Sequence, residues 1–220
     1  MPASGTTRSA RSVGQKTGAT FELEDALVPD YGSPVAGVDE AGRGPLAGPV
    51  VAAAVILDRQ AVPPGLADSK ALSAAARQTL FDAICRTASV SVAMASVRQI
   101  DAMNIREATL SAMTQAARGL ATNPACVLID GRDVPPGLPC PGASAIKGDA
   151  RSLSVAAASI VAKVTRDRLM CTLDGCYPGY GFNRHMGYGT KIHLEALDRL
   201  GPCAIHRTSF RPVADLLERS

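Results

Sequence analysis

Apolar runs at strand-like spacing stand out in the first two thirds of the chain. The run from 48 to 57 is almost unbroken, which indicates a strand covered on both faces, and its Pro49 suits the start of a strand better than a helix interior. Residues 89–97 alternate between apolar and polar positions, so they predict a strand with one face in water. The predicted strands span residues 35–38, 48–57, 89–97, 125–130 and 144–146.

Helix signals follow or separate these strands. Ser73 is a good N-cap residue, and Asn104 followed by Glu107 resembles a capping box. The alanine-rich stretch that begins at Arg151 has small side chains that permit close packing, and Gly201-Pro202 marks a helix stop. The predicted helices span residues 74–86, 105–120, 151–173 and 191–200.

Strands come first and then alternate with helices, and the final third of the chain is mainly helical. This order predicts an α/β sheet with a helical C-terminal extension. We expect residues 1–30 to form a disordered basic tail, because Gly, Ser and Thr are frequent near the start and no acid occurs in 1–21. One domain would then span 31–220, with its helical part at about 151–220.

Acidic residues stand where predicted strands end. Asp39 and Glu40 follow the first strand, and Asp130 closes the fourth. In open α/β sheets the crevice beyond such strand ends binds ligands. Successive strand residues face opposite sides, so Asp39 and Glu40 converge only if the strand stops there, and Ala41-Gly42 predicts that stop.

Asp149 precedes the long helix and adds a fourth acid at an element boundary. Four carboxylates brought together without cations repel one another, and their pKa values rise. Divalent metal relieves that repulsion, and hard oxygen ligands select Mg²⁺ or Mn²⁺. A pair of such ions suits in-line displacement at a phosphodiester, so the acids predict phosphodiester chemistry.

Each acid also has a structural interpretation. Asp149 could cap the following helix, and Asp130-Gly131 could be an ordinary turn. Asp39-Glu40 is harder to explain that way, because charges beside buried strands are costly without a role. The three histidines form no compact zinc pattern and indicate scattered polar contacts instead; they are His185, His193 and His206.

Composition and charge indicate the kind of binding partner and the cellular compartment. The net charge is +3, and the basic residues of 1–21 account for that surplus. A second basic segment, 147–191, suits a polyanion held near a metal site, although solvated helix faces are the alternative. The six cysteines form no CxxC pair and indicate reduced thiols, and no apolar stretch is long enough for a membrane span, so we expect a cytoplasmic protein without membrane contact.

Six segments of the chain form a set of motifs that is specific jointly, although none is decisive alone. They are GVDEAGRGPLAGPVVAAAV from residue 37, DSKALS (68–73), IDG (129–131), AIKGDARSLSVAAASIVAKVTRD (145–167), HMGYGTKIH (185–193) and HRTSF (206–210). Together these segments resemble the ribonuclease HII (type 2 ribonuclease H) family, and the resemblance covers about residues 34–213.

The resemblance implies a ribonuclease H-like mixed sheet flanked by helices. It also implies metal-dependent endonucleolytic cleavage of the RNA strand in RNA–DNA hybrids and 5′ of single ribonucleotides in duplex DNA, with a role in ribonucleotide removal. By motif position, the residues that bind metal would be Asp39, Glu40, Asp130 and Asp149, with Mn²⁺ or Mg²⁺ and two ions per site. The residues that bind substrate would be Gly42, Arg43, Gly44, Lys70 and Tyr188. The chain departs from the family pattern at Met186, where a lysine is expected.

Other assignments remain open at this stage. A rival enzyme is another nuclease of the ribonuclease H superfamily, and a rival of another class is a non-catalytic hybrid-binding module, which should lack one of the four acids. A nucleotide-binding domain would need a GxxxxGK[ST] phosphate loop, which GRGPLAG does not match. We expect a monomer that acts on RNA–DNA hybrid and ribonucleotide-containing duplex DNA, and a sliding-clamp partner is possible but cannot be read from the sequence.

Overall fold

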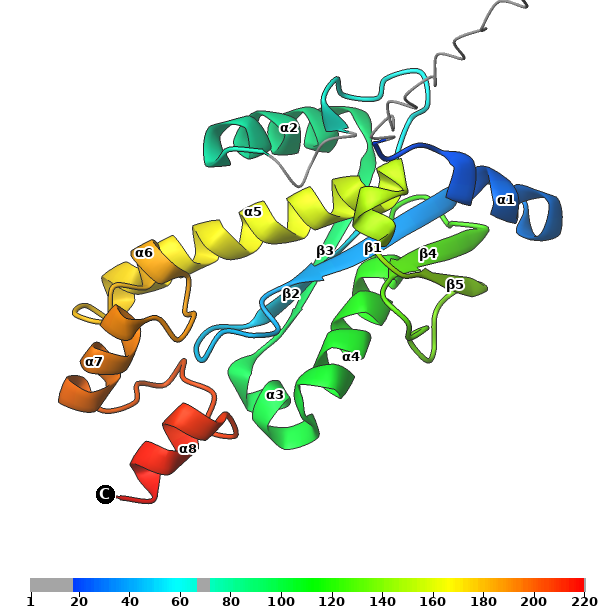
Figure 1. Ribbon diagram of the computed structural model, residues 1–220. Coiled ribbons are helices and arrows are strands. Elements are labelled where there is room, and N and C mark those ends of the chain that lie inside the picture. The colour runs from blue at the N-terminus through cyan, green and yellow to red at the C-terminus, as the bar shows by residue number, and fades with distance from the viewer. Residues whose placement is uncertain (1–17, 67–71, 220) are drawn as a thin grey trace, which may run out of the picture.

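The computed structural model describes residues 18–66 and 72–219 and shows a mixed five-stranded sheet with helices on both faces (Figure 1). The strand order is β3-β2-β1-β4-β5. β1 pairs antiparallel with β2 and β2 with β3, whereas β4 runs parallel to both β1 and β5. The predicted α/β class and the mixed sheet are therefore confirmed.

The strands lie close to the predicted positions. β2 is buried at every residue, as its unbroken apolar run predicts, and β3 is only partly buried at the edge of the sheet. The fifth strand begins and ends earlier than predicted. The strands are β1 (Val35–Ala41), β2 (Val50–Ile56), β3 (Ser89–Ala95), β4 (Cys126–Asp130) and β5 (Gly142–Ala145).

The main predicted helices are also present. Ser73 and Asn104 cap α2 and α4, since their side chains accept hydrogen bonds from the N–H groups of Ala76 and Glu107. The helices are α1 (Glu22–Tyr31), α2 (Ala74–Thr87), α3 (Val97–Met103), α4 (Ile105–Arg118), α5 (Leu153–Cys176), α6 (Phe182–His185), α7 (Lys191–Leu200) and α8 (Arg211–Leu217), with a short 3₁₀ helix, η2 (Gly148–Ala150).

Two helices cover the central strands from opposite sides. α4 packs on one face through its alanines and Met113, and α5 packs on the other. The contact with α5 is close because Gly37 of β1 lacks a side chain: a Cβ there would lie 2.1 Å from the carbonyl carbon of Ser154. The long helix is thus held directly against the strand that carries Asp39 and Glu40.

The prediction of a disordered tail over residues 1–30 is wrong for residues 18–30. Residues 22–31 form α1, whose Leu23, Leu27 and Val28 pack against the sheet. Ala19 is buried before it, and Thr20 forms a β-bridge with Ser152. This segment escaped prediction because its helix is polar and contains Pro29, and tertiary contacts hold it in place. Residues 1–17 of the expected tail lie outside the described residues.

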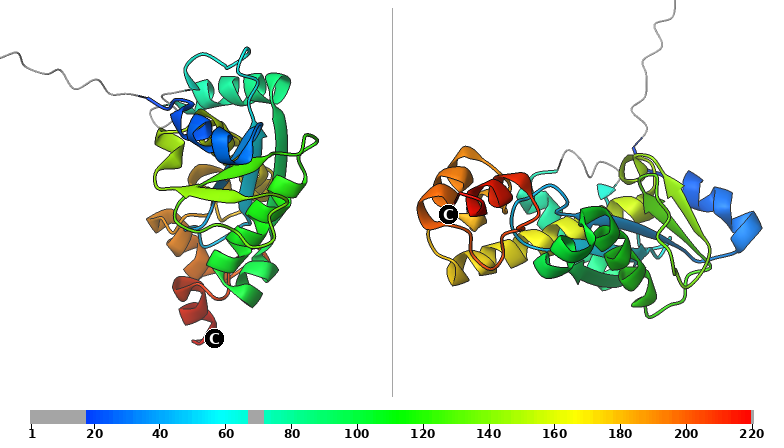
Figure 2. Two further views of the ribbon diagram at one scale, coloured as in Figure 1. Left: turned by 90° about the vertical axis from the view of Figure 1, so that its right-hand side faces the viewer. Right: turned by 90° about the horizontal axis from the view of Figure 1, so that it is seen from below.

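The C-terminal helical extension is confirmed. α6, α7 and α8 gather beyond one end of the sheet, and α1 lies at the other end (Figure 2). Short helices were not predicted: α3, α6 and α8 carry too few residues to show a clear period. Over the described residues, no helix combines the length and the apolar character needed to cross a membrane.

Candidate active site

The register of the sheet brings two of the predicted acids together. Val38 of β1 lies opposite Ile129 of β4 in a parallel pair, so Asp39 and Asp130 come next along the same two strands. Asp39 is buried, and Asp130 accepts a hydrogen bond of 2.6 Å at Oδ1 from the Gly148 N–H. Their convergence follows from strand pairing and not from nearness in sequence.

Glu40 reaches the same place from the other face of the sheet. The predicted stop of the strand before Ala41 is wrong. β1 runs through Ala41, so the side chains of Asp39 and Glu40 point to opposite faces of the sheet. Asp39 faces α5, where Ser159 hydrogen-bonds its carboxyl group, and Glu40 lines a small pocket together with Arg43 and Asp130. The two acids therefore approach Asp130 from opposite sides.

The electrostatics of these acids show the cost of their proximity. Burial raises the pKa of Asp39 well above its usual value, and the charges of Glu40 and Asp130 raise it further, against hydrogen bonds from Ser159 and the Glu40 N–H. Burial also raises the pKa of Glu40, although Arg43, whose Nη1 lies 3.3 Å from Glu40 Oε1, partly offsets this. Negative charge is thus disfavoured at this site in the protein alone.

Asp149 lies on the turn that Asp130 holds. It belongs to η2, and the N–H of the preceding Gly148 donates to Asp130. The interpretation of Asp149 as the cap of the long helix is wrong, because Ser152 is the N-cap of α5 and its Oγ accepts from the Val155 N–H at 3.1 Å. The interpretation of Asp130-Gly131 as an ordinary turn is incomplete, because the Asp130 side chain accepts its hydrogen bond from Gly148, outside that turn.

The acids fit a divalent cation by chemistry, although they do not form a closed cage. Within residues 18–66 and 72–219, no group of three or more His, Cys, Asp or Glu side chains is arranged to hold a metal ion as it stands. The donors nevertheless are all carboxylate oxygens, which Mg²⁺ and Mn²⁺ prefer. A cation between Asp39, Glu40 and Asp130 would relieve the repulsion that adds to the effect of burial on the pKa values of Asp39 and Glu40.

The glycine–arginine–glycine turn follows the acids directly and is only partly exposed. Gly42 is buried with a φ of +98°, whereas Arg43 and Gly44 are exposed. A Cβ on Gly44 would lie 3.8 Å from Cε1 of Tyr188, whose side chain is 45% exposed. The structure therefore brings Tyr188 to this turn, as expected for two parts of one surface, while Lys70 lies outside the described residues.

Two buried arginines hold the loop of residues 42–49, which contains this turn, and sequence reasoning missed both roles. Arg166 was expected on the basic surface of 147–191, but it is 1% exposed, because it occupies the buried stripe of α5 between Ala162 and Met170. That stripe was the signal available in the sequence. Arg166 donates to the carbonyls of Pro49 (3.0 Å), Ala47 (3.1 Å) and Met186 (2.9 Å). Arg207 donates to those of Gly42 (2.6 Å), Arg43 (2.8 Å) and Gly48 (3.0 Å).

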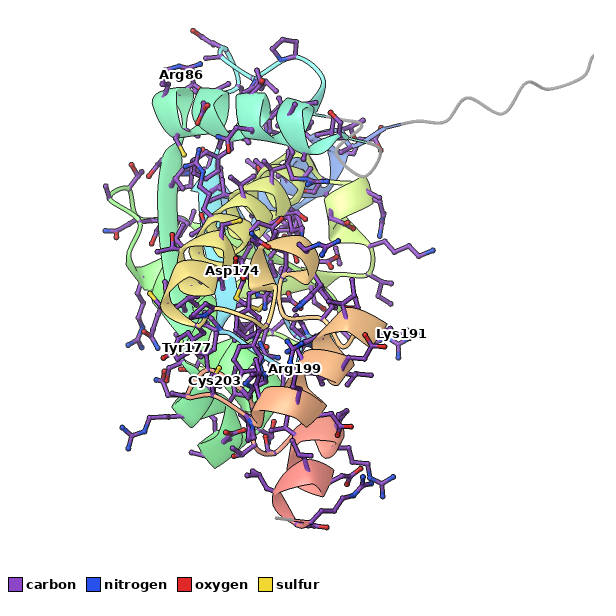
Figure 3. The ribbon with its side chains drawn as sticks, turned by 90° about the vertical axis from the view of Figure 1, so that its left-hand side faces the viewer. Arg86, Asp174, Tyr177, Lys191, Arg199 and Cys203 are labelled. Atoms are coloured by element: carbon purple, nitrogen blue, oxygen red, sulfur yellow. The ribbon has the colours of Figure 1, made fainter. Side chains whose placement is uncertain are left out.

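Other basic residues of 147–191 are engaged in ion pairs. Lys163 pairs with Asp167 at 2.8 Å, and Arg168 lies 3.6 Å from Asp82. Lys191 lies 3.8 Å from Glu195 but is 89% exposed and projects from α7 (Figure 3). The segment is therefore less basic at its surface than its composition indicates.

The histidines are clustered and not scattered as predicted. His193 Nε2 lies 3.0 Å from His206 Nε2, and the rings of His185 and His193 stack with centroids 4.4 Å apart. His206 Nδ1 accepts from the N–H of Cys203, which belongs to the C-terminal region in Figure 3, and His193 Nδ1 lies 2.9 Å from the carbonyl of Tyr188. His193 therefore links His206 to the backbone carbonyl of Tyr188.

Met186, where the resemblance leads us to expect a lysine, has a structural role here. It adopts a left-handed φ of +51°, and its carbonyl accepts from Arg166. Its side chain packs on the apolar cluster around Phe182. The residue therefore helps to seat the turn that precedes Tyr188.

The chain is similar to known proteins over most of its length. The family model of ribonuclease HII matches residues 36–213. Ribonuclease HII of Azorhizobium caulinodans is 59% identical over 206 residues, which is 94% of this chain and 79% of that protein. The ribonuclease H2 structure from Pyrococcus horikoshii has a TM-score of 0.71 and 30% identity, and covers 84% of this chain and 97% of its own. A PCNA:RNase HII complex from Archaeoglobus fulgidus has a TM-score of 0.70 and 28% identity over 83% of this chain and 96% of that one.

Fold, acids and relatives together define a metal-dependent ribonuclease H, a hydrolase that cuts its nucleic acid internally, and confirm the ribonuclease H-like fold. Within that class, the chain belongs to the ribonuclease HII family. The expected enzyme class and the dependence on a divalent metal are thereby confirmed, whereas the role of each site residue stays a prediction.

Proposed function

We propose that this enzyme cuts the RNA strand of RNA–DNA hybrids and also cuts on the 5′ side of a single ribonucleotide in duplex DNA, leaving a 3′-hydroxyl and a 5′-phosphate. One observation carries the second activity: the exposed Arg43-Gly44 turn lies beside Tyr188 and directly follows Asp39 and Glu40 along the chain. A sugar recognised at this turn would lie next to the acids. Removal of stray ribonucleotides from DNA would be the corresponding repair role.

The four acids would share the metal chemistry. Asp39, Glu40, Asp130 and Asp149 would hold Mn²⁺ or Mg²⁺, two ions during catalysis, and such ions activate water and neutralise charge at a phosphodiester. Arg43 pairs with Glu40 in the protein alone, at 3.3 Å. Entry of a cation would free this guanidinium, which could then turn to a substrate phosphate.

Recognition of the ribose would depend on peptide groups. Gly44 is exposed and has no Cβ, so a nucleic-acid backbone can approach its peptide groups closely. Peptide N–H and C=O groups can bond a 2′-hydroxyl, which is what distinguishes RNA from DNA at one position. Tyr188 would stack on the sugar at the junction, and Lys70 would hold a phosphate.

The setting of the reaction is part of the proposal. All six cysteines are free thiols, which suits the cytoplasm. We propose a monomer, since the site is built within one chain. The protein from Archaeoglobus fulgidus was solved as a complex with PCNA, and on this basis a sliding clamp is a proposed partner here too.

Product mapping on end-labelled duplexes with zero, one or several ribonucleotides tests the proposal, with Mg²⁺, Mn²⁺ or EDTA in parallel. We expect a cut 5′ of the single ribonucleotide, no cut in all-DNA duplex, and no activity in EDTA. Equal cutting of all-DNA duplex, or cutting only within long RNA tracts, would contradict the proposal and favour another nuclease of the superfamily.

The role of Tyr188 has a matched control. Tyr188→Ala should reduce cutting at a single ribonucleotide more than cutting of a long hybrid. Tyr31 on α1 is similarly exposed, 44% against 45%, and lies away from the site, so Tyr31→Ala should change neither. Equal losses on both substrates for Tyr188→Ala would remove the tyrosine from junction recognition.

A further inference from the structure

A buried carboxylate outside the catalytic acids lies on the N-terminal helix. Glu24 of α1 is 1% exposed. Its Oε1 accepts two hydrogen bonds from the start of α5, one of 2.7 Å from Ser152 Oγ and one of 2.9 Å from the Ser154 N–H. Its Oε2 is also buried and has no hydrogen-bond partner among the described residues. Burying a carboxylate costs free energy, and the two hydrogen bonds to Oε1 offset part of that cost.

Backbone hydrogen bonds join the same two segments, residues 20–24 and the start of α5, beside the contacts of Glu24. The Thr20 N–H donates to the carbonyl of Arg151 at 3.0 Å, and the Leu153 N–H donates to the carbonyl of Thr20 at 3.0 Å. Residues 20–24 therefore bind both the backbone and the N-cap side chain at the start of α5. This start immediately follows η2, which carries Asp149.

A continuous series of hydrogen bonds then leads to the catalytic acids. The Ser152 N–H donates to the carbonyl of Gly148 at 2.7 Å, and the Gly148 N–H donates to Asp130 Oδ1 at 2.6 Å. The turn that bears Asp149 is thus held at one end by Asp130 and at the other by Glu24 and Thr20. Groups that orient a metal ligand in this way commonly matter about tenfold to a hundredfold for metal affinity.

We propose that Glu24 is a positioning residue that fixes the Asp149 turn for metal binding, so that α1 supports the active centre through this one side chain. This segment lies before residue 36, where the match to the family model begins. The inference rests on the proposed role of Asp149 as a metal ligand. It assigns α1 a function beyond covering the sheet.

Two substitutions separate the geometry of Glu24 from its charge. Glu24→Gln keeps an acceptor oxygen at the Oε1 position and changes only the oxygen that makes no bond. Glu24→Asp keeps the charge but withdraws the acceptor by one methylene. Glu22 is exposed on the same helix, so Glu22→Gln serves as the matched control.

The measurements use the full chain, first without substrate. Mn²⁺ binding is followed by electron paramagnetic resonance and by the metal-induced shift of the thermal midpoint, and cleavage of a hybrid is then measured against Mn²⁺ concentration. We expect Glu24→Asp to need about tenfold more Mn²⁺ in both measurements. KM for the hybrid should be unchanged, and Glu24→Gln and Glu22→Gln should behave like the wild type.

The outcomes distinguish this inference from the proposed function. Wild-type Mn²⁺ affinity in Glu24→Asp would overturn the inference, even if its metal-free thermal midpoint falls, because the residue would then be structural only. Glu24→Gln as defective as Glu24→Asp would overturn it as well. Asp149→Asn with normal Mn²⁺ affinity would remove the premise on Asp149, whereas a wild-type enzyme that leaves single ribonucleotides uncut contradicts the proposed function alone.

Discussion

At the scale of single residues, the active site concentrates unfavourable charge. Asp39 is buried within a strand, beside Glu40 and Asp130. Its raised pKa means that the folded protein holds a proton that the unfolded chain releases more readily. The contribution of this group to stability is present at acid pH and is lost as pH rises through the folded pKa, so near neutral pH the acid destabilises the metal-free protein.

Asp39→Asn should abolish cleavage, because Asp39 is a proposed metal ligand. It should also stabilise the metal-free protein, because it removes a buried negative charge. If the substitution removes about 1 kcal/mol of repulsion, the thermal midpoint in EDTA rises by about 2–4 °C. The midpoint should also depend less on pH, because the titrating group is gone. Calorimetry in EDTA from acid to neutral pH, beside activity assays in Mn²⁺, measures both effects.

Asp198→Asn is the control for this substitution, because Asp198 is exposed on α7. It should leave both the midpoint and the cleavage rate unchanged. Near-normal turnover in Asp39→Asn would remove Asp39 from the catalytic acids, and a lower midpoint in EDTA would show that its carboxylate is stabilising.

At the scale of elements, a helix and a C-terminal arginine position the loop that carries the proposed substrate surface. The loop from 42 to 49 has little regular structure, and Arg166 of α5 and Arg207 hold its carbonyls. Burial lowers the pKa of both guanidinium groups, to about 9 for Arg207. They remain cations at neutral pH and supply hydrogen-bond donors that no apolar side chain provides.

The two glycines of the turn should respond differently to alanine. A Cβ on Gly42 would lie 2.0 Å from Arg166 Nε, in a left-handed backbone conformation, whereas a Cβ on Gly44 meets nothing nearer than Tyr188 at 3.8 Å. Gly42→Ala should destabilise the protein by about 1–3 kcal/mol. Gly44→Ala should unfold like the wild type yet lose cleavage, because its methyl group meets the substrate.

Urea unfolding and single-turnover cleavage of both variants check this prediction. Gly65 also has a positive φ, and a Cβ there meets nothing within 4 Å, so Gly65→Ala shows the effect of backbone strain alone. A destabilised Gly44→Ala, or a fully active one, would contradict the assignment of that glycine to the substrate surface.

At the scale of the whole molecule, the C-terminal region is bound to the loop of residues 42–49. Ala47 forms a β-bridge with His206, and the N–H groups of Leu46 and Gly48 donate to the carbonyls of Gly187 and Ile205. His206 of this bridge belongs to the histidine cluster, since its Nε2 lies 3.0 Å from His193 Nε2. Burial, together with the neighbouring His193, lowers the pKa of His206 from 6.5 to about 4.

Because of this histidine cluster, we expect the free energy of unfolding to fall in acid. Because the folded pKa of His206 is lowered, the unfolded chain binds its proton first, and stability declines as pH falls from 6.5 towards about 4. His193 should add to the effect, since burial lowers its pKa as well. Urea unfolding across this range should show the decline, and His206→Gln should make it shallower at the expense of stability at neutral pH. An equally steep decline in His206→Gln would assign the acid sensitivity to other groups.

The sequence by itself determined the class of fold, the main elements and the acids that the family resemblance selects. Apolar period and capping residues are local, so β2, α2, α4 and α7 were predictable within a few residues, and Ser73 and Asn104 cap where expected. The placement of Asp130 at a strand end was likewise visible in the chain, whereas Asp39 lies inside β1, which continues to Ala41.

Only the tertiary structure decided what long-range contacts hold. The convergence of Asp39 with Asp130 depends on strand register, and the burial of Arg166 and Arg207 depends on carbonyls that lie more than a hundred residues away. α1 and the histidine cluster follow the same rule: Glu24 bonds to Ser152, and His193 meets His206, across gaps that no local pattern spans. Polar groups such as these bury only when their partners arrive, and those partners come from the fold.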